Sequence, residues 1–292
     1  MMVAAAATTA AWSLGRPTAA GISAAAVQRL VPFWIALACC IALVGMASSD
    51  GADVTPRPLR WAHMVFVDKY NDAYAQGQND YGQLGLGDRV ERNGPALVMS
   101  GVKSVAWGAY HTLFVTQEGA LYAAGRNEFG ELGDGTNKDR DVPVFVMEGI
   151  REAAAGESHS LLLCSNGSVF AMGRNGNGQL GDGTNIDRST PVLVSDNATA
   201  IGAGWLHSAF LLLNTSVFAM GSNAYGQLGD GTRIQRNRPI EVHAENVSDI
   251  KVGGFHTTLL QHDGGTQELG LLNWTGSSQE YRIMPPRAIP LR

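Results

Sequence analysis

The sequence predicts an all-β protein: a β-propeller of four-stranded antiparallel blades, with about five repeat units and a ring whose closure this number leaves open. Three observations lead to this fold class. Four segments align without gaps at a spacing of 48 residues, close to the length of one propeller blade. Glycine makes up 36 of the 292 residues, which is enough to serve many tight turns. Within each unit, short apolar runs alternate with turns, and no helical period competes.

The four aligned segments share a glycine-rich stretch that is followed by an arginine and a proline. They read GQNDYGQLGLGDRVERNGPALV from Gly77, GRNEFGELGDGTNKDRDVPVFV from Gly125, GRNGNGQLGDGTNIDRSTPVLV from Gly173 and GSNAYGQLGDGTRIQRNRPIEV from Gly221. A histidine column follows the same period, with one inserted residue before its last member: His63, His111, His159, His207 and His256. The copies therefore lie near residues 61–98, 99–146, 147–194 and 195–242, with a degenerate copy at 243–292.

The copy that contains His207 shows the expected strands of one blade. They are Ala200 to Gly204, His207 to Leu213, Ser216 to Gly221 and Pro239 to Val242. The hairpin between the second and third strands has a tip that reads Asn166-Gly167, Glu118-Gly119 or Asp263-Gly264 in other copies, and such pairs favour turns with positive φ.

The number of copies leaves the closure of the ring open. The first copy begins at His63 without its first strand, and the last lacks the glycine-rich stretch. An open arc leaves two sheet edges unpaired. A truncated chain, a smaller ring and self-association with another chain each account for this count.

The combination of Gly-x-x-His-[Ser/Thr]-Leu, an apolar strand and Gly-x-Asn-x-x-Gly-Gln-Leu-Gly-Asp-Gly-Thr resembles a known family. It is similar to the regulator of chromosome condensation repeat, also called the alpha-tubulin suppressor repeat, over about residues 61–262. The resemblance implies a propeller of seven four-stranded blades, of which this sequence has about five. It also implies an alternative function, guanine-nucleotide exchange on a small GTPase, because the founding member acts on Ran while bound to chromatin.

Residues 1–49 differ in composition from the remainder of the chain. They contain Arg16 and Arg29, no acidic residue, and a continuous apolar stretch from Leu30 to Ala47 that is followed by small residues. This pattern predicts a signal peptide, with an uncleaved signal anchor as the alternative, and residues 50–60 as a linker. Either form would export the repeats, so we expect a secreted or membrane-anchored protein whose only membrane contact is this segment.

Two further features bear on export. Five Asn-x-Ser/Thr sequons are candidate glycosylation sites: Asn166, Asn197, Asn214, Asn246 and Asn273. Because strand direction alternates, the first four are expected on one face of the propeller. Cys39 and Cys40 lie in the apolar leader, which leaves Cys164 alone in the repeats, where we expect a buried, inert thiol.

The remaining patterns argue against catalysis and against a metal or other cofactor. A net charge of −5 offers no basic surface for nucleic acid. The five histidines occupy separate blades and cannot converge on one ion, so we interpret them as packing residues. The run from Asp182 to Asp187 lacks the ligand spacing of a calcium loop. The arginine column is expected to pair with loop carboxylates or carbonyls: Arg92, Arg140, Arg188 and Arg236.

The copies differ most in two sets of loops, and these loops point to a non-enzymatic, protein-binding module. The loops between the first and second strands and between the third and fourth emerge on the same face, and aromatic side chains there are typical anchors of interfaces. Candidate partner-binding residues in the first set are Tyr110, Glu157, Trp205 and Phe255. Those in the second set are Tyr81, Phe129 and Tyr225.

Overall fold

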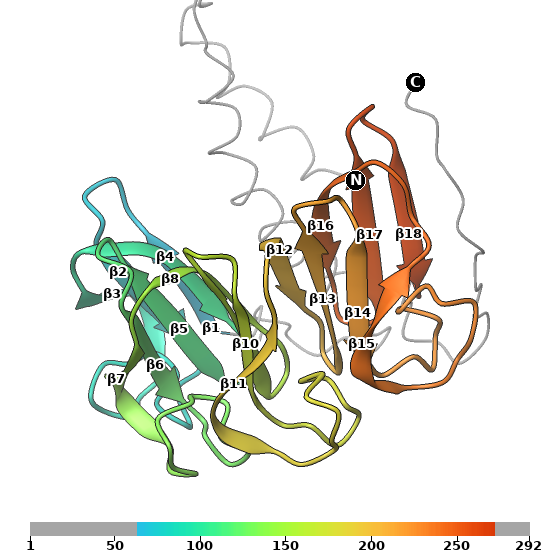
Figure 1. Ribbon diagram of the computed structural model, residues 1–292. Helices are drawn as coiled ribbons and strands as arrows, with labels where there is room; N and C mark the ends of the chain where they lie inside the picture. The colour runs from blue at the N-terminus through green and yellow to red at the C-terminus, as the bar shows by residue number, and fades with distance from the viewer. Residues whose placement is uncertain (1–62, 272–292) are drawn as a thin grey trace, which may run out of the picture. The chain divides into compact units, whose positions relative to one another are not determined.

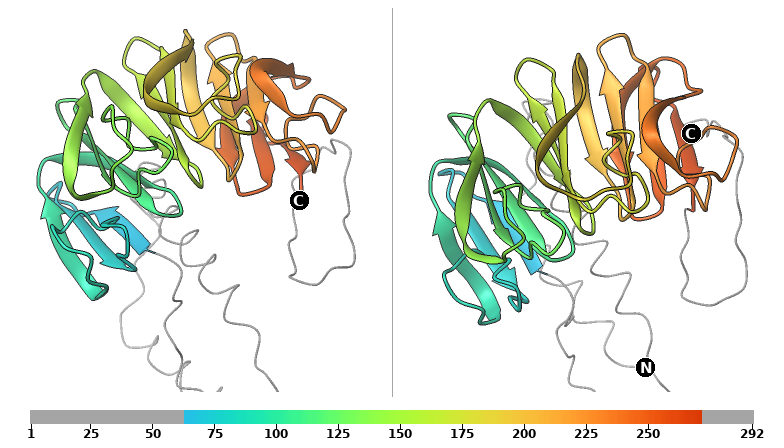
Figure 2. Two further views of the ribbon diagram at one scale, coloured as in Figure 1. Left: turned by 90° about the horizontal axis from the view of Figure 1, so that it is seen from below. Right: turned by 60° about the horizontal axis from the view of Figure 1, so that its bottom comes forward.

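The computed structural model describes residues 63–271, and within that range the chain forms eighteen β-strands and no helix. The strands build five antiparallel sheets, each from strands consecutive in the sequence. The sheets succeed one another along an arc, with β1 and β18 in the two end sheets (Figures 1 and 2). The predicted all-β blades are therefore confirmed, and the described residues do not close a ring.

We number the sheets as blades 1 to 5 in chain order. Blade 1 contains β1 (His63–Val67), β2 (Ala73–Gly77) and β3 (Arg92–Met99). Blade 2 contains β4 (Val102–Trp107), β5 (His111–Thr116), β6 (Leu121–Gly125) and β7 (Arg140–Met147). Blade 3 contains β8 (Ile150–Ala155), β9 (His159–Cys164), β10 (Val169–Gly173) and β11 (Arg188–Ser195). Blade 4 contains β12 (Ala198–Ala203), β13 (His207–Leu212), β14 (Val217–Gly221) and β15 (Arg236–Val242). Blade 5 contains β16 (Val247–Val252), β17 (His256–Gln261) and β18 (Thr266–Gly270).

The four strands expected around His207 are present as β12 to β15. The last of them begins earlier than expected, at Arg236 instead of Pro239, because a register shift lets Arg236 pair with Gly221. Within the described residues, blade 1 begins with β1, the strand that bears His63. Among the described residues, blade 5 has no fourth strand.

The core lies between the faces of consecutive blades. Between blades 2 and 3, for example, Leu113 and Leu121 of one sheet pack with Leu162 and Met172 of the next, and all four side chains are fully buried. Equivalent clusters join the other neighbours. Successive side chains in a strand point to opposite faces, so a strand covered on both sides buries every side chain, and its polar side chains need hydrogen-bond partners. This explains the continuous burial of β5 and β9.

Strand alternation separates the connections into two faces. The loop face consists of the loops between first and second strands (108–110, 156–158, 204–206, 253–255) and between third and fourth strands (78–91, 126–139, 174–187, 222–235). The turn face consists of the hairpin tips and the links between blades. Backbone hydrogen bonds join neighbouring connections on each face, such as Arg126 N–H to the Tyr110 carbonyl and Ile150 N–H to the Gly119 carbonyl.

Three predicted features lie outside the described residues: the signal segment 1–49, the linker 50–60 and the sequon at Asn273. In the part of the chain that the structure does describe, no helix has the length and apolar character needed to cross a membrane.

Candidate interaction surface on the loop face

The two predicted sets of aromatic residues meet on the loop face. Tyr81 of blade 1 contacts Tyr110 of blade 2 edge to face, with ring centroids 5.3 Å apart. Tyr225 of blade 4 contacts Phe255 of blade 5 at 5.2 Å, and Trp205 contacts the same Phe255 ring at 4.7 Å. In both of these blade pairs, a ring of the loop between the third and fourth strands contacts a ring in the first loop of the following blade.

Two arginines that sequence reasoning missed extend this aromatic row. The Arg126 guanidinium lies 5.6 Å from the ring centroids of both Tyr81 and Tyr110 and 5.2 Å from that of Phe129. Arg174 lies 5.2 Å from the same Phe129 ring. A guanidinium near aromatic faces is stabilised by the ring quadrupole, and the stacking restricts its rotamers. The signal was present in the sequence, because both arginines directly follow the third strand of their blades.

Glu157 and Trp205 lie in the loops between first and second strands, on the same loop face. The Glu157 carboxylate is 3.9 Å from the Arg174 guanidinium. The Glu157 N–H points to the Trp205 carbonyl at 3.4 Å, and the Trp205 N–H donates to the Gly254 carbonyl at 3.1 Å. These loops line a cavity of about 280 Å³ together with Trp107, whose side chain is partly exposed and which the sequence did not single out. The loop face therefore combines an aromatic and arginine row with a shallow, partly apolar hollow.

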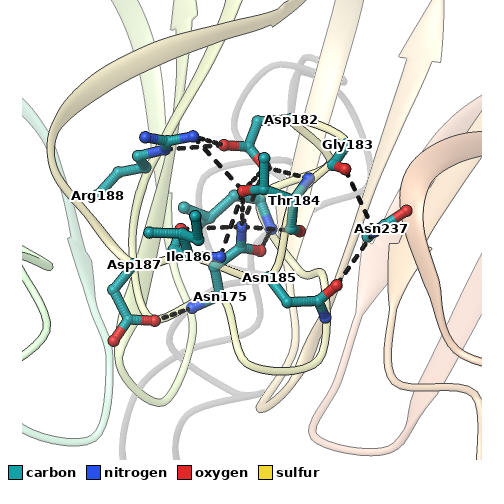
Figure 3. Close-up of polar contacts among 10 residues, drawn as sticks. Asn175, Asp182, Gly183, Thr184, Asn185, Ile186, Asp187, Arg188 and Asn237 are labelled. Carbon is teal, nitrogen blue, oxygen red and sulfur yellow. Dashed lines mark hydrogen bonds and ion pairs between the residues drawn. The ribbon is translucent and has the colours of Figure 1, made fainter.

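The glycine-rich loops are rigid because their polar groups bond to one another (Figure 3). Asn175 Nδ2 donates to Asp182 Oδ1 at 3.0 Å and to the Thr184 and Ile186 carbonyls, while Asn175 Oδ1 accepts from the Leu180 N–H. The other Asp182 oxygen pairs with Arg188 at 2.7 Å. Blades 2 and 4 repeat this arrangement. Burial opposes ionisation of the equivalent Asp230, but hydrogen bonds from Arg236 and Thr232 lower its pKa to about 2.

The predicted role of the arginine column is confirmed by these pairs. In blade 1, Leu86 stands at the position of Asp182, and Asp88 supplies the carboxylate instead. Asp88 accepts a hydrogen bond from Asn79 and pairs with Arg92 at 2.6 Å. The loop carboxylates are thus occupied by arginine and amide donors. Among the described residues, no group of three or more potential metal ligands is present.

Column histidines form hydrogen bonds that join consecutive blades. We call each such set a clasp: a histidine, a hydroxyl of the next blade and a backbone carbonyl of the histidine's own blade. His159 Nε2 of blade 3 lies 2.9 Å from Ser208 Oγ of blade 4, and this hydroxyl donates back to the Gln179 carbonyl of blade 3 at 2.8 Å. Since the hydroxyl proton is used by the carbonyl, Nε2 must carry the histidine proton. Three other clasps follow the same plan: His63 with Thr112, His111 with Ser160 and His207 with Thr257. These four histidines are at most 5% exposed, which is what the expected packing role requires of them.

Burial keeps the clasp histidines neutral. It lowers the pKa of His63 and His159 to about 4 and is the largest of the causes that lower the pKa of His111 and His207 to about 3. His256 belongs to the last blade, and no clasp with a following blade is formed by it within residues 63–271.

The seam between blades 2 and 3 also holds a buried acid. Glu131 takes the place of Gln83, Gln179 and Gln227 in the other copies and is only 1% exposed. Its carboxylate accepts from the Phe129 N–H at 2.8 Å, as the glutamine carbonyls do in their own loops. Burial raises the pKa of Glu131 to about 7.

The four described sequon asparagines lie on the turn face and are exposed: Asn166, Asn197, Asn214 and Asn246. Asn166 and Asn214 occupy hairpin tips, whereas Asn197 and Asn246 occupy links between blades and have positive φ. Their occupancy by glycans stays a prediction. Cys164 is buried, as expected, and burial raises the pKa of its thiol.

Blades of antiparallel strands that repeat at a fixed period and pack face to face define a propeller-type repeat protein. The regulator of chromosome condensation (RCC1) repeat matches residues 71–115, 118–163, 166–211 and 215–260, which is more than half of the chain. A second description of this repeat matches 102–131, 150–179 and 198–227. The chain therefore belongs to the RCC1 repeat family, as its motifs had indicated.

Solved structures agree with this assignment. Human WBSCR16 is 24% identical with a TM-score of 0.63, over 74% of this chain and 59% of its own. Yeast RCC1 (Prp20), solved bound to Kap60, is 22% identical with a TM-score of 0.63, over 78% and 60%. Prp20p from Saccharomyces cerevisiae, described with its binding properties to Gsp1p and histones, is 23% identical with a TM-score of 0.62, over 79% and 62%. This chain spans about three fifths of these relatives, and identities this low show the fold alone. No curated protein sequence matches the chain.

Proposed function

We propose that this chain is a non-enzymatic protein-binding module that recognises its partner through the loop face. The observation that carries the proposal is the row of partly exposed aromatic and arginine side chains that crosses blades 1 to 3 and resumes on blades 4 and 5. Aromatic and arginine residues are the most frequent hot spots of protein interfaces, because they bury large areas and lose little rotamer freedom. The row is held in place before any partner arrives, which lowers the entropic cost of binding.

Binding rather than catalysis suits the chemistry of this face. Glu131 has the raised pKa of a general acid or base, but it is sealed between two blades and cannot reach a substrate. The aspartates of the glycine-rich loops are already paired with arginines. The rings and guanidiniums of the row are accessible, and they contribute contact area and hydrogen bonds.

The direct test compares substitutions on the two faces of the full chain. Arg126→Ala combined with Arg174→Ala should lower partner recovery at least tenfold, measured by quantitative affinity purification from the source cells, with an unchanged melting temperature. The matched control is Leu213→Ala, because this side chain is 76% exposed at a hairpin tip of the turn face. Recovery that falls for Leu213→Ala and persists in the arginine variant would reverse the assignment of the faces.

Guanine-nucleotide exchange is the alternative function that the family raises. The solved relative Prp20p is described with its binding properties to Gsp1p and histones, and exchange through surface contacts needs no catalytic side chains. The purified chain should leave the release of fluorescent nucleotide from a Ran-type GTPase unchanged. Faster release that depends on Tyr110 or Phe129 would establish the exchange function instead.

We further propose that the repeats work in the lumen of the secretory pathway or outside the cell. Support comes from the sequence of the leader and from the four exposed sequons on the turn face, where bulky glycans would leave the loop face open. A tagged full chain should shift in apparent mass after glycosidase treatment, and the shift should shrink in an Asn166→Gln variant. A nuclear protein that is insensitive to glycosidase would refute this location.

A further inference from the structure

One buried position of the repeat is acidic in one copy and neutral in the others. Blade 2 has Glu131 where blades 1, 3 and 4 have Gln83, Gln179 and Gln227, and all four side chains are at most 1% exposed. Each accepts a hydrogen bond from the backbone N–H two residues earlier. A glutamine therefore meets the structural demand of this site, and the carboxyl group of Glu131 adds the ability to ionise.

Glu131 also joins the aromatic and arginine row to the seam between blades 2 and 3. Its carboxylate accepts from the Phe129 N–H at 2.8 Å, and the Phe129 ring lies 5.2 Å from the guanidiniums of both Arg126 and Arg174. Its backbone carbonyl accepts from the Ser160 hydroxyl at 2.8 Å, which is part of the clasp of this seam. A change at Glu131 therefore reaches the row and the seam together.

The loop that carries Glu131 brings the titration of its side chain close to neutral pH. Burial is the largest influence and raises the pKa of Glu131 to about 7. The N–H groups of Glu131 and Phe129 and the charge of Arg126 act in the opposite direction, whereas Asp139 acts in the same direction as burial. Asp139 is itself 3.5 Å from the Arg89 guanidinium of blade 1. The carboxyl group therefore gains its charge as the pH rises through 7.

The other titratable and charged groups around this seam are accounted for. The two clasp histidines stay neutral, because burial, the largest cause, lowers the pKa of His111 to about 3 and that of His159 to about 4. Charged groups of the adjoining loops form ion pairs: Arg140 with Asp134, Arg174 with Glu157 and Arg188 with Asp182. Between pH 6 and 8, the charge of the seam therefore changes through Glu131.

We propose that Glu131 is a positioning residue that makes the loop face sensitive to pH: its neutral form keeps Arg126, Phe129 and Arg174 in order, and its ionised form loosens them. A carboxylate in a dry seam is relieved when water enters or when a cation turns toward it. Arg126 is the cation whose charge already acts on Glu131, and turning inward would take it away from the Tyr81 and Tyr110 rings. This inference rests on the proposed function of the loop face, to which it adds regulation.

The expected effect on binding follows from the share of chains in which Glu131 is neutral. With a pKa of about 7, this share is roughly nine tenths at pH 6 and roughly one tenth at pH 8. When only the ordered row binds, the apparent affinity is the intrinsic affinity multiplied by this share. The affinity for the partner should therefore fall about tenfold from pH 6 to pH 8.

Amide hydrogen exchange on the full chain tests the ordering without a partner. The readout is the exchange of residues 126–132 relative to that of residues 174–180, a loop with the same hydrogen bonds and with Gln179 at the buried position. The ratio cancels the intrinsic pH dependence of exchange, which both loops share. It should rise several-fold from pH 6 to pH 8 in wild type and stay constant in Glu131→Gln. Glu131→Gln combined with Gln179→Glu should reverse the direction of the change.

Partner recovery by affinity purification at pH 6 and pH 8 tests the regulation. Wild-type recovery should fall about tenfold at pH 8, whereas Glu131→Gln should keep its recovery. The matched control is Glu148→Gln, because Glu148 is an exposed acid on the turn face. This control should keep the pH dependence of the wild type.

Two results would overturn the proposal. The first is an exchange ratio that does not change with pH in wild type. The second is a pH dependence of recovery that is the same in wild type and Glu131→Gln. Failure of the proposed function has a different signature: the Arg126→Ala, Arg174→Ala chain then recovers as much partner at pH 6 as the wild type does. In that case the exchange ratio alone decides whether Glu131 orders the loop.

Discussion

At the scale of single residues, the seams between blades depend on hydroxyls that serve two partners at once. Ser208 accepts the His159 proton and donates to the Gln179 carbonyl, and all three groups are buried. Ser208→Ala would leave a buried donor and a buried acceptor unpaired, so we expect a loss of about 2–3 kcal/mol in the free energy of unfolding. Urea denaturation measures this loss.

The matched variant is Ser208→Thr, because threonine already fills the same position as Thr112 and Thr257. It should keep both hydrogen bonds and cost well under half as much. Equal losses in the two variants would mean that packing volume, and not the clasp, stabilises the seam.

Glu131 should make stability depend on pH. Its folded pKa of about 7 lies above the value of an exposed glutamate, so the folded state holds its proton more tightly than the unfolded state. This contribution is fully present below about pH 4.5 and is lost as pH rises through 7. Glu131→Gln should therefore be more stable than wild type at pH 8, by about 2–3 kcal/mol, and similar at pH 5.

Denaturation curves at the two pH values test this expectation. Gln179→Glu is the reciprocal variant, because Gln179 is also buried and accepts from a loop N–H in the same way. It should introduce the same pH-dependent loss into blade 3. The four clasp histidines change the stability of both chains equally over this range, so the difference between the chains is the readout. Equal stability of wild type and Glu131→Gln at both pH values would contradict the buried acid.

At the scale of elements, the hairpin tips explain one local departure from the repeat. Gly119, Gly167 and Gly264 have φ between 84° and 90° at these tips, but blade 4 has Thr215 there with φ of 69°. A β-branched residue is strained in this region. Thr215→Gly should therefore raise the free energy of unfolding by roughly 1 kcal/mol, with thermal unfolding as the measurement. The reverse change, Gly167→Thr, should destabilise.

A glycine stands three residues before the column histidine in blades 2 to 5, and close packing between blades leaves no room there for a side chain. A Cβ on Gly156 would overlap the Gly204 carbonyl oxygen and the His159 ring. Gly156→Ala should cost at least ~3 kcal/mol or prevent folding, because the backbone atoms in its way cannot move without opening the seam. Gly176→Ala is the control, since no atom lies within 4 Å of its Cβ position. It should change stability by less than about 0.5 kcal/mol.

Strands and turns were predictable from the sequence because their causes are local. Alternation, apolar runs and Asn-Gly pairs act within a few residues, and β12 to β14 appear where they were expected. The start of β15 was missed because the register shift opposite Gly221 depends on the glycine-rich loop between the two strands. The stacking of Tyr81 on Tyr110 could not be derived either, since it joins loops of different blades. The position of Arg126 directly after its strand was visible in the sequence, but its contacts with rings of two blades were not.

At the scale of the whole molecule, the connections divide the surface into two sides with different chemistry. The loop face carries the stacked rings and guanidiniums, and the turn face carries the exposed sequons Asn166 and Asn214. The separation follows from strand alternation alone, so the sequence could predict it. It suits a module that is shielded on one side and binds a protein on the other.

Site-specific photo-crosslinking on the full chain in its source cells tests the loop-face claim most directly. A photoreactive aromatic residue would replace Tyr110 in one sample and Leu213 in another. We expect an adduct of one defined mass from position 110, its disappearance in the Arg126→Ala background, and no such adduct from position 213. The same adduct from position 213, with none from position 110, would place the partner on the turn face instead of the loop face.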